Sequence, residues 1–398
     1  MSELYVLPEG WEWKKLGDLV DVNIGKTPTR SKKEYFLGDN VWLSIRDLKD
    51  NYVSSSNEGL TDDAIKNTRM KIVPKGTLLM SFKLTLGKTA FAGCDLYTNE
   101  AIAAMPIKNE NKLDKFFLKY AINVIDLEKE VDNAVKGKTL NKQKIKNLDI
   151  PIPPLQEQKR IVAKLDSLFE RIDRAITLHR QNIDEADALM GAVLNEVFGE
   201  LEGKYEKRNL ASFDPNISAG GTPLRKEKAY WNGNIEWYSS GELNQLYTLP
   251  SKEKITQLGL ENSSAKLFSK GTLLIGMYDT AAMKMSILSN DASCNQAIVG
   301  FKPKENELNI LFVKYQLEYL KEKILEQRQG VRQKNLNLTK IKNIIIEYPP
   351  LKIQQKTVQY LDRIARETEK LKQVQQQKLQ QLKDLKASFL DRAFRGEL

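Results

Sequence analysis

The stretch PPLQEQKRIVAKLDSLFERIDRAITLHRQNIDEADALM, residues 153–190, decides the architecture of this chain. Apolar side chains recur in it at alternating spacings of three and four residues over several heptads, and no proline follows the opening pair. This heptad pattern is typical of a long helix that packs along a seam against another helix. His179 falls on the seam, where we expect a partly buried residue rather than a pH switch or a ligand. The expected seam residues are Leu165, Phe169, Ile172, Ile176 and Ile183.

A second Pro-Pro-Leu, residues 349–351, precedes a similar tail. Proline fits a helix start because its missing N–H would be unpaired there. Residues 152–201 carry six basic and nine acidic side chains and residues 351–398 carry eleven and six, which favours pairing of the two tails. We therefore expect an antiparallel coiled coil within the chain; the alternative is that each helix binds a different partner protein. The expected seam residues of the second tail are Leu361, Ile364, Leu371, Leu382 and Leu385, and the polar residues Thr368, Gln375 and Lys378 occupy weaker seam positions.

The chain is a tandem duplication, because its motifs recur in the same order at an offset of 194 to 197 residues. Two similar units predict pseudo-two-fold symmetry, which suits two similar partners or two half-sites on one polymer. The paired segments include Gly25–Pro28 with Gly220–Pro223, Lys75–Leu79 with Lys270–Leu274, Asn99–Ile102 with Asn295–Ile298, and Gly199–Leu201 with Gly396–Leu398.

The part of each unit before its tail combines short β-rich runs, such as Gly76–Phe82 and Gly271–Met277, with helical spacing at Phe116–Ile125 and Leu311–Leu320. The predicted fold class is therefore α+β: two similar globular domains joined by two long antiparallel coiled-coil helices. The expected boundaries are 1–151 for the first domain, 152–201 for the first helix, 202–348 for the second domain and 349–398 for the second helix.

Composition excludes several classes of protein. The chain of 398 residues has 62 Lys and Arg against 52 Asp and Glu, a net charge of +10 that is compatible with nucleic acid but does not require it. No apolar run reaches the roughly 18 residues of a membrane span, and the first residues do not form a secretory signal. Two cysteines, Cys94 and Cys294, exclude a disulfide scaffold and favour the cytoplasm.

The sequence offers little catalytic equipment. It has one histidine, no GxxxxGK[ST] loop and no GxGxxG after a strand, which argues against histidine-dependent hydrolases, NTPases and dinucleotide enzymes. No carboxylates have a recognisable metal-binding spacing. We therefore expect no catalytic residues, no metal and no cofactor in this chain.

Binding signals are stronger, because glycine, threonine and basic residues gather in corresponding loops of the two units. Small residues allow close approach to a phosphate, and Lys, Arg, Asn and Gln can donate to phosphates or base edges. The alternative is that these are ordinary solvated turns. The expected DNA-binding residues are Lys26, Thr27, Thr29, Arg30, Lys32, Lys33, Lys83, Thr85, Lys88, Lys136, Lys138, Asn141, Thr222, Arg225, Lys226, Tyr278, Lys284, Arg328, Gln329, Arg332, Gln333 and Lys334.

Over its whole length the chain resembles the DNA specificity subunit of type I restriction-modification enzymes. The resemblance rests on the order and duplication of short motifs rather than on any one of them. These are Leu7–Trp11 followed by Leu16–Leu19, the two Gly-x-Thr-Pro elements, the Pro-Pro-Leu-x-x-Gln junction Pro153–Gln158, and the closing segment Phe389–Leu398.

The resemblance implies that each domain is a target recognition domain for one half of a bipartite, asymmetric double-stranded DNA sequence, and that the helices set the spacer. It implies docking of two modification subunits that carry S-adenosylmethionine and methylate adenine. Two restriction subunits, which use ATP with Mg²⁺, would join through those. Two other readings remain open: a coiled-coil scaffold whose globular ends bind proteins, and a stand-alone DNA-modifying enzyme. The recognised bases do not follow from the sequence.

Overall fold

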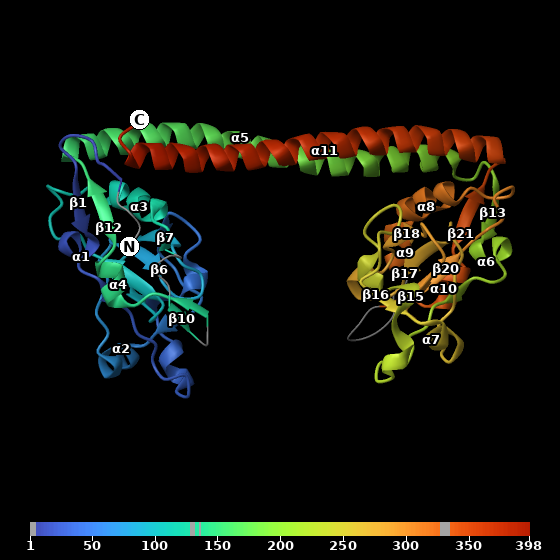
Figure 1. Cartoon of the computed structure of the whole chain (residues 1–398), viewed down its shortest axis with the longest axis horizontal. Coiled ribbons are helices and arrows are strands. Elements are labelled where there is room, and N and C mark those ends of the chain that lie inside the picture. The colour runs from blue at the N-terminus through green and yellow to red at the C-terminus, as the bar shows by residue number, and fades with distance from the viewer. Residues whose placement is uncertain (1–4, 128–131, 135–136, 327–334) are drawn as a thin grey trace. The chain divides into compact units, whose positions relative to one another are not determined.

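The computed structural model describes residues 5–127, 132–134, 137–326 and 335–398. It divides into two units, Met1–Leu178 with Lys378–Leu398, and His179–Gln377. Each unit contains one α+β domain and parts of two long helices, α5 (Leu155–Leu201) and α11 (Leu351–Phe394) (Figure 1). The α+β class and the two long helices are as the sequence predicts.

The sheets of the first domain are mostly antiparallel. A five-stranded sheet has the order β2-β9-β6-β7-β4, in which only β4 and β7 are parallel. A three-stranded sheet has the order β5-β3-β8. Two further sheets have two strands each, β1 with β12 and β10 with β11. The strands are β1 Glu12–Lys15, β2 Asn23–Ile24, β3 Asn40–Leu43, β4 Tyr52–Val53, β5 Gly59–Leu60, β6 Leu78–Ser81, β7 Thr89–Ala92, β8 Tyr97–Thr98, β9 Ile102–Met105, β10 Asp132–Ala134, β11 Gly137–Thr139 and β12 Asp149–Ile152.

Short capped helices connect these strands. The Asp114 side chain accepts hydrogen bonds from the first backbone N–H groups of α3, and Thr61 and Asn141 cap α2 and α4 in the same way. Such caps satisfy N–H groups that have no partner inside the helix. The helices of this domain are α1 Leu16–Leu19, α2 Asp62–Thr68, α3 Lys115–Val124 and α4 Lys142–Lys146, with 3-10 turns η1 Lys33–Phe36 and η2 Ile45–Asp47.

The second domain repeats this arrangement. Its sheets have the orders β14-β20-β17-β18 and β16-β15-β19, and β13 pairs with β21. The strands are β13 Glu206–Asn209, β14 Ser218–Ala219, β15 Trp231–Tyr238, β16 Glu253–Ile255, β17 Leu273–Gly276, β18 Met285–Ile287, β19 Ala292–Cys294, β20 Ile298–Phe301 and β21 Ile345–Tyr348. The helices are α6 Leu210–Phe213, α7 Gln257–Glu261, α8 Ile310–Tyr319, α9 Lys321–Glu326 and α10 Leu338–Lys342, with 3-10 turns η4 Lys228–Tyr230, η5 Ser240–Glu242 and η6 Asp279–Ala281.

The central strand of each main sheet is buried on both faces, which explains its unbroken apolar sequence. In β6, Leu78 and Met80 belong to a core shared with α3 and the long helices, whereas Leu79 belongs to a second core on the other face. In β17, Leu273 and Leu274 divide in the same way. Figure 1 shows α3 and α8 between the strands of their own domain and the long helices.

The long helices run antiparallel within each unit, because partner numbers in α11 fall as those in α5 rise. In the first unit Arg160 donates to the backbone oxygen of Leu398, and Lys386 pairs with Asp173 at 2.7 Å. In the second unit His179 contacts Gln375, and Lys372 pairs with Asp187 at 2.8 Å. Both lysine–aspartate pairs join a basic α11 to an acidic α5, as expected from their charges.

The seam of α11 differs from the prediction at two positions. Leu371 and Leu385 are 44% and 42% exposed, whereas Thr368 and Gln375 are buried. Gln375 occupies the seam because its side chain is hydrogen-bonded to His179 of α5, which lies at the predicted seam position. Thr368 and Gln375, expected at weaker seam positions, are thus more buried than Leu371 and Leu385. Leu165, Phe169, Ile172 and Leu361 are buried as predicted, and Ile176, Ile364 and Leu382 pack at the edge of the same cores.

Within the described ranges, none of the helices is both long enough and apolar enough to cross a membrane.

Candidate nucleic-acid interface

The Gly-x-Thr-Pro loops have a structural reason for their glycines. A Cβ at Gly25 would overlap the backbone oxygen of Thr98, and one at Gly220 would overlap that of Cys294. The loop is therefore pressed against the end of a neighbouring strand in both units. The sequence suggested close approach to a phosphate, but here the approach is to the chain's own backbone.

A tryptophan and an arginine fix each loop. The indole of Trp42 donates to the Lys26 carbonyl at 3.0 Å, and Trp237 donates to the Gly221 carbonyl at the same distance. The Arg30 guanidinium lies 4.2 Å from the ring centroid of Phe36, which is within range of a cation–π interaction.

Each of these arginines also has a glutamate partner. Arg30 binds both carboxylate oxygens of Glu58, and this contact raises the pKa of Arg30 and lowers the pKa of Glu58. Arg225 has the same surroundings, with Trp231 at 4.1 Å and a two-point ion pair to Glu253. Arg30 and Arg225 thus hold their loops in shape, and each ion pair uses two of the five N–H donors of the guanidinium.

The threonine of each loop contacts the second repeated motif. Thr27 donates to Glu100, and Thr222 donates to Gln296. The preceding residues, Asn99 and Asn295, each accept a hydrogen bond from the backbone N–H two residues later. The separate motifs noticed in the sequence therefore form one hydrogen-bonded framework in each unit.

The other predicted residues of these loops lie at the surface. Lys32 donates to the Tyr35 hydroxyl at 3.1 Å, and the hydroxyls of Thr29 and Ser31 are 3.0 Å apart. Lys33 and Lys226 are exposed. The loop after β6 presents Thr85 and Lys88 to solvent, with Lys83 half-buried beside Phe82. In the second unit Lys284 donates to Asn244 at 2.9 Å, and Tyr278 packs against the core.

The third predicted loop is only partly described. Asn141 accepts from the Lys144 N–H and so caps α4, as Asn337 caps α10 by accepting from Lys340. The remaining candidates of this loop are Lys136, Arg328, Gln329, Arg332, Gln333 and Lys334, which lie outside the described residues, and Lys138, whose strand but not side chain is described.

The Pro-Pro-Leu-x-x-Gln junction attaches each long helix to its domain through a buried glutamine. The Gln158 side chain accepts from the Asp114 N–H at 2.8 Å and donates to the carbonyls of Lys112 and Pro153, each at 2.9 Å. Gln354 accepts from the Asn309 N–H at 2.8 Å and donates to the Pro349 carbonyl at 2.8 Å. Each glutamine thereby ties the start of α5 or α11 to the N-terminal cap of α3 or α8.

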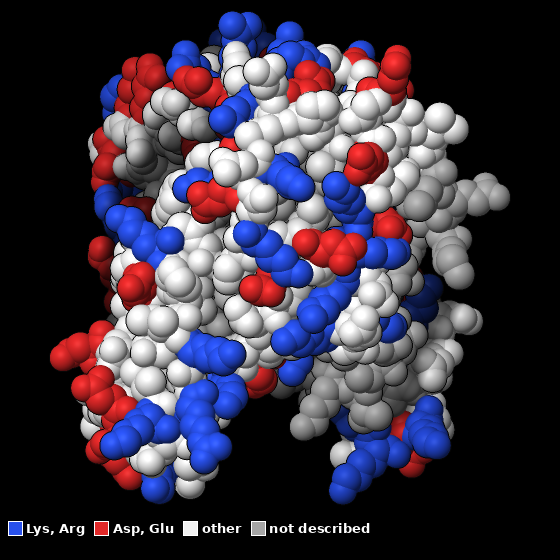
Figure 2. Space-filling model, turned by 90° about the vertical axis from the view of Figure 1, so that its left-hand side faces the viewer, with Lys and Arg blue, Asp and Glu red and all other residues white. Residues whose placement is uncertain are grey.

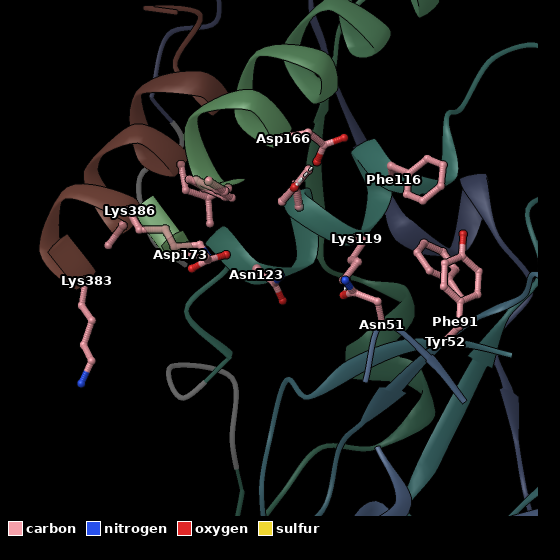
Figure 3. A pocket seen from close by; sticks show the side chains of 14 residues that line it. Asn51, Tyr52, Phe91, Phe116, Lys119, Asn123, Asp166, Asp173, Lys383 and Lys386 are labelled. Atoms are coloured by element: carbon pink, nitrogen blue, oxygen red, sulfur yellow. Dashed lines mark hydrogen bonds and ion pairs between the residues drawn. The ribbon is translucent and has the colours of Figure 1, made fainter. Parts of the chain in front are cut away.

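A cavity of about 620 Å³ lies in the first unit where α3 meets the two long helices (Figure 3). Its wall is aromatic at Tyr52, Phe91 and Phe116 and polar at the long helices. Lys119 points into it and donates to Asn51, and burial lowers the pKa of Lys119 although Asp166 opposes this. Sequence reasoning missed this site, since its residues come from segments far apart in the chain.

Charge on the surface of the first unit is divided rather than continuous. Figure 2 shows lysine and arginine side chains in several separate groups, with carboxylates between them. In the part of the chain that is described, no group of three or more His, Cys, Asp and Glu could hold a metal ion.

Comparison with known proteins identifies the family. The model of the type I restriction modification DNA specificity domain matches twice, at residues 8–186 and 204–381. The chain belongs to this family. Each match takes in one α+β domain and most of the long helix that follows it, so the repeated framework described above is present in both specificity domains.

Curated relatives carry names of the same kind. The chain is 24% identical over 386 residues to the type I restriction enzyme MjaIX specificity subunit of Methanocaldococcus jannaschii, covering 89% of this chain and 87% of that protein. It is 26% identical over 175 residues to the EcoR124I/EcoR124II specificity subunit of Escherichia coli, covering 42% of each.

Two solved structures share the fold of this specificity subunit. One, from work on complex assembly and conformational transition of the type I R-M system, has a TM-score of 0.79 at 22% identity, over 99% of this chain and 100% of that one. The HsdS subunit from Thermoanaerobacter tengcongensis has a TM-score of 0.55 at 21% identity, over 100% of this chain and 99% of that one.

Proposed function

We propose that each specificity domain reads one half of a bipartite, asymmetric DNA target, and that α5 and α11 set the length of the unread spacer. One observation carries this proposal: the two domains keep the same hydrogen-bonded framework, while the loops that follow β6 and β17 differ in sequence and in burial, the second being largely buried. Residues 81–88 read SFKLTLGK, whereas residues 276–284 read GMYDTAAMK. One scaffold carrying two different loops is what two readers of different short sequences require.

The expected contacts follow from the geometry of the loops. Lys32, Lys33 and Lys226 are exposed beside a framework that is held by tryptophan and arginine, so they suit phosphate contacts that place a domain on the duplex. The loops after β6 and β17, with Lys88 and Lys284, are the candidates for base contacts. Half-sites on one face of B-DNA lie about 34–36 Å apart, one helical turn.

The proposal includes partner subunits that supply the chemistry. Two modification subunits would dock on the domains and helices, bind S-adenosylmethionine and methylate adenine. Restriction subunits using ATP and Mg²⁺ would join through them. This chain would contribute recognition and positioning, and its own residues would take no step in methyl transfer.

Sequencing the methylated adenines of a host that expresses this chain with its modification subunits tests the function. We expect a bipartite motif with a fixed spacer that disappears when the gene for this chain is deleted. Exchange of residues 202–348 for those of another family member should change one half of the motif and leave the other half intact. A motif that is unaffected by both changes would exclude the proposal.

The same preparation tests the two alternatives. A scaffold that binds proteins would show no steep fall of DNA affinity with salt, whereas phosphate contacts produce one. A stand-alone modifying enzyme would transfer methyl groups without a modification subunit.

A further inference from the structure

A small basic cavity lies beneath the first Gly-x-Thr-Pro loop. Its volume is about 180 Å³, and Lys26, Arg69, Lys71 and Lys142 line it without any carboxylate among the lining residues. These cations come from three separate segments: the loop itself, the end of α2 and the start of α4. Four positive groups around one cavity, with no acid to neutralise them, favour an anion.

The cation of the loop is fixed in place but keeps a donor. Lys26 donates to the carbonyls of Thr68 and Arg69, at 3.0 and 3.2 Å. An ammonium has three N–H donors, so one remains for a ligand. Arg69 itself has φ of 51°, in the left-handed region that residues other than glycine seldom adopt. Arg69 is the C-cap residue of α2, and helices commonly end in this conformation.

A buried hydroxyl also lacks a partner at this cavity. Thr98 lines it, is 2% exposed, and its Oγ1 makes no hydrogen bond with any of the described residues. Burying a hydroxyl without a partner costs about 1–3 kcal/mol, so such a group is usually satisfied by something. Because this oxygen is closed off from solvent, an anion in the cavity could accept its hydrogen bond only after the Thr98 side chain turns towards it.

The second unit lacks this arrangement at the same positions of the repeat. Gly221 stands in place of Lys26, Ser264 in place of Arg69 and Leu338 in place of Lys142, and only Lys266 remains a cation. Gly221 is also packed so closely against the Ser264 backbone that a Cβ would overlap it. The basic cavity is therefore a property of the first domain and not of the shared framework.

We propose that this cavity binds one phosphate group, and that in the DNA-bound protein this is a backbone phosphate beside the first half-site. The second part rests on the proposed function; the affinity for phosphate does not. The cavity thereby anchors the first domain at one point of the duplex by a contact that the second domain does not make.

The first experiment uses inorganic phosphate and the full chain without DNA. At constant ionic strength, phosphate replacing chloride should raise the thermal midpoint by about 3 °C at ten times its Kd. Lys142→Leu, which introduces the residue of the second unit, should abolish the rise, whereas Lys266→Gln should keep it. Arg69→Ser provides a second variant in case Lys142→Leu disturbs α4.

The second experiment uses the assembled complex and a duplex carrying the recovered target. Lys142→Leu should lower the slope of log affinity against log salt by about 1, and Lys266→Gln should lower it less. A set of duplexes, each with one phosphate replaced by an uncharged methylphosphonate, locates the contact. At one position the replacement should lower the DNA affinity of the wild type about ten-fold and leave the affinity of Lys142→Leu unchanged.

The two experiments separate the sources of the phosphate. If one methylphosphonate weakens the wild type but not Lys142→Leu, and inorganic phosphate does not raise the thermal midpoint, the cavity binds the DNA backbone alone. If inorganic phosphate raises the midpoint and no methylphosphonate position distinguishes the two proteins, the cavity binds free phosphate. If neither appears while the wild type still binds its target, the cavity inference is wrong and the proposed function stands. If the wild type binds no DNA, the proposed function fails, and the thermal experiment alone decides whether the cavity binds phosphate.

Discussion

The two specificity domains share the contacts that hold their loops and helices in place, and they differ at single side chains within those contacts. Trp42 and Trp237 donate to equivalent carbonyls, and Gln158 and Gln354 accept from the backbone N–H of the N-cap residues of α3 and α8. By contrast, Glu100, the acceptor for Thr27, is replaced by Gln296. The ion pairs Arg30–Glu58 and Arg225–Glu253 are also present in both copies, so the framework is kept through backbone and side-chain partners alike.

The same contrast appears where α3 and α8 face the long helices. Tyr120 donates to Asp166 of α5, and Tyr315 donates to Asp362 of α11 at 2.6 Å. One turn away the two units differ. Lys314 pairs with Glu318 at 2.6 Å in the second unit, but the position equivalent to Glu318 is Asn123 in the first unit. The open, lysine-containing cavity of the first unit is thus the place where a shared helix-docking contact has diverged.

The largest expected effect comes from shortening the helices while both domains are left intact. Removal of seven residues from each helix around the His179–Gln375 contact keeps the heptad phase and shortens the coiled coil by about 10 Å. We expect affinity for the original target to fall by at least about 10³-fold, to the non-specific level. Selection from a library of spacer lengths should recover a target with a shorter spacer.

Shortening only one helix provides the control, since it breaks the antiparallel register and should abolish specific binding at every spacer length. An unchanged preferred spacer in the doubly shortened chain would show that the helices do not set it.

The next largest effect comes from adding a Cβ to the glycine of each Gly-x-Thr-Pro loop, and it tests whether the loop is packed equally tightly in both units. Gly25→Ala places a Cβ against the Thr98 carbonyl, and Gly220→Ala places one against Cys294. Because backbone must move in each case, we expect each variant to lose about 3 kcal/mol of unfolding free energy in urea titration. Gly191→Ala is the matched control, since its Cβ meets nothing within 4 Å in α5, and it should gain about 0.5–1 kcal/mol. A small loss in one unit alone would show that its loop can shift.

Sequence gave the duplication, the α+β class and the two helices, because these depend on periodicity and repetition. The side chains that contact one another could not be predicted, because they lie far apart in the chain. Arg30 was predicted to contact DNA, and nothing near it in the sequence indicates that it pairs with Glu58, 28 residues away. The heptad pattern also did not show that Gln375 would be more buried than Leu371, and the cavity cations Arg69, Lys71 and Lys142 come from the ends of two different helices. Only the runs Arg69–Lys71 and Asn141–Lys146, rich in basic residues, hinted at that cavity.

The two junction glutamines allow a finer comparison. Gln158→Ala leaves three backbone groups without their partner and Gln354→Ala leaves two, and one group in each set is fully buried. We expect losses of about 2 kcal/mol, larger for Gln158, in the unfolding transition of the respective unit. Gln156→Ala, in an exposed position two residues earlier, should change stability by less than about 0.5 kcal/mol. Equal effects of all three variants would mean that the glutamine does not fasten the helix to its domain.

The smallest expected change in stability comes from replacing the equivalent lysines Lys119 and Lys314, and it should have opposite signs in the two units. Burial lowers the pKa of Lys119, so the folded chain releases this proton at a lower pH than the unfolded chain, whose lysine titrates near 10.4. The unfolded state then binds more protons, and stability rises with pH through the interval below about 10.4. Lys119→Met should therefore stabilise the first unit by less than about 1 kcal/mol at pH 7, and the difference from wild type should shrink towards pH 10. Lys314→Met should instead destabilise the second unit by about 1 kcal/mol, since it leaves Glu318 without its cation. Urea titrations of both variants between pH 7 and 10 measure this, and a loss of stability in Lys119→Met would show that the lysine is held by more than its contact with Asn51.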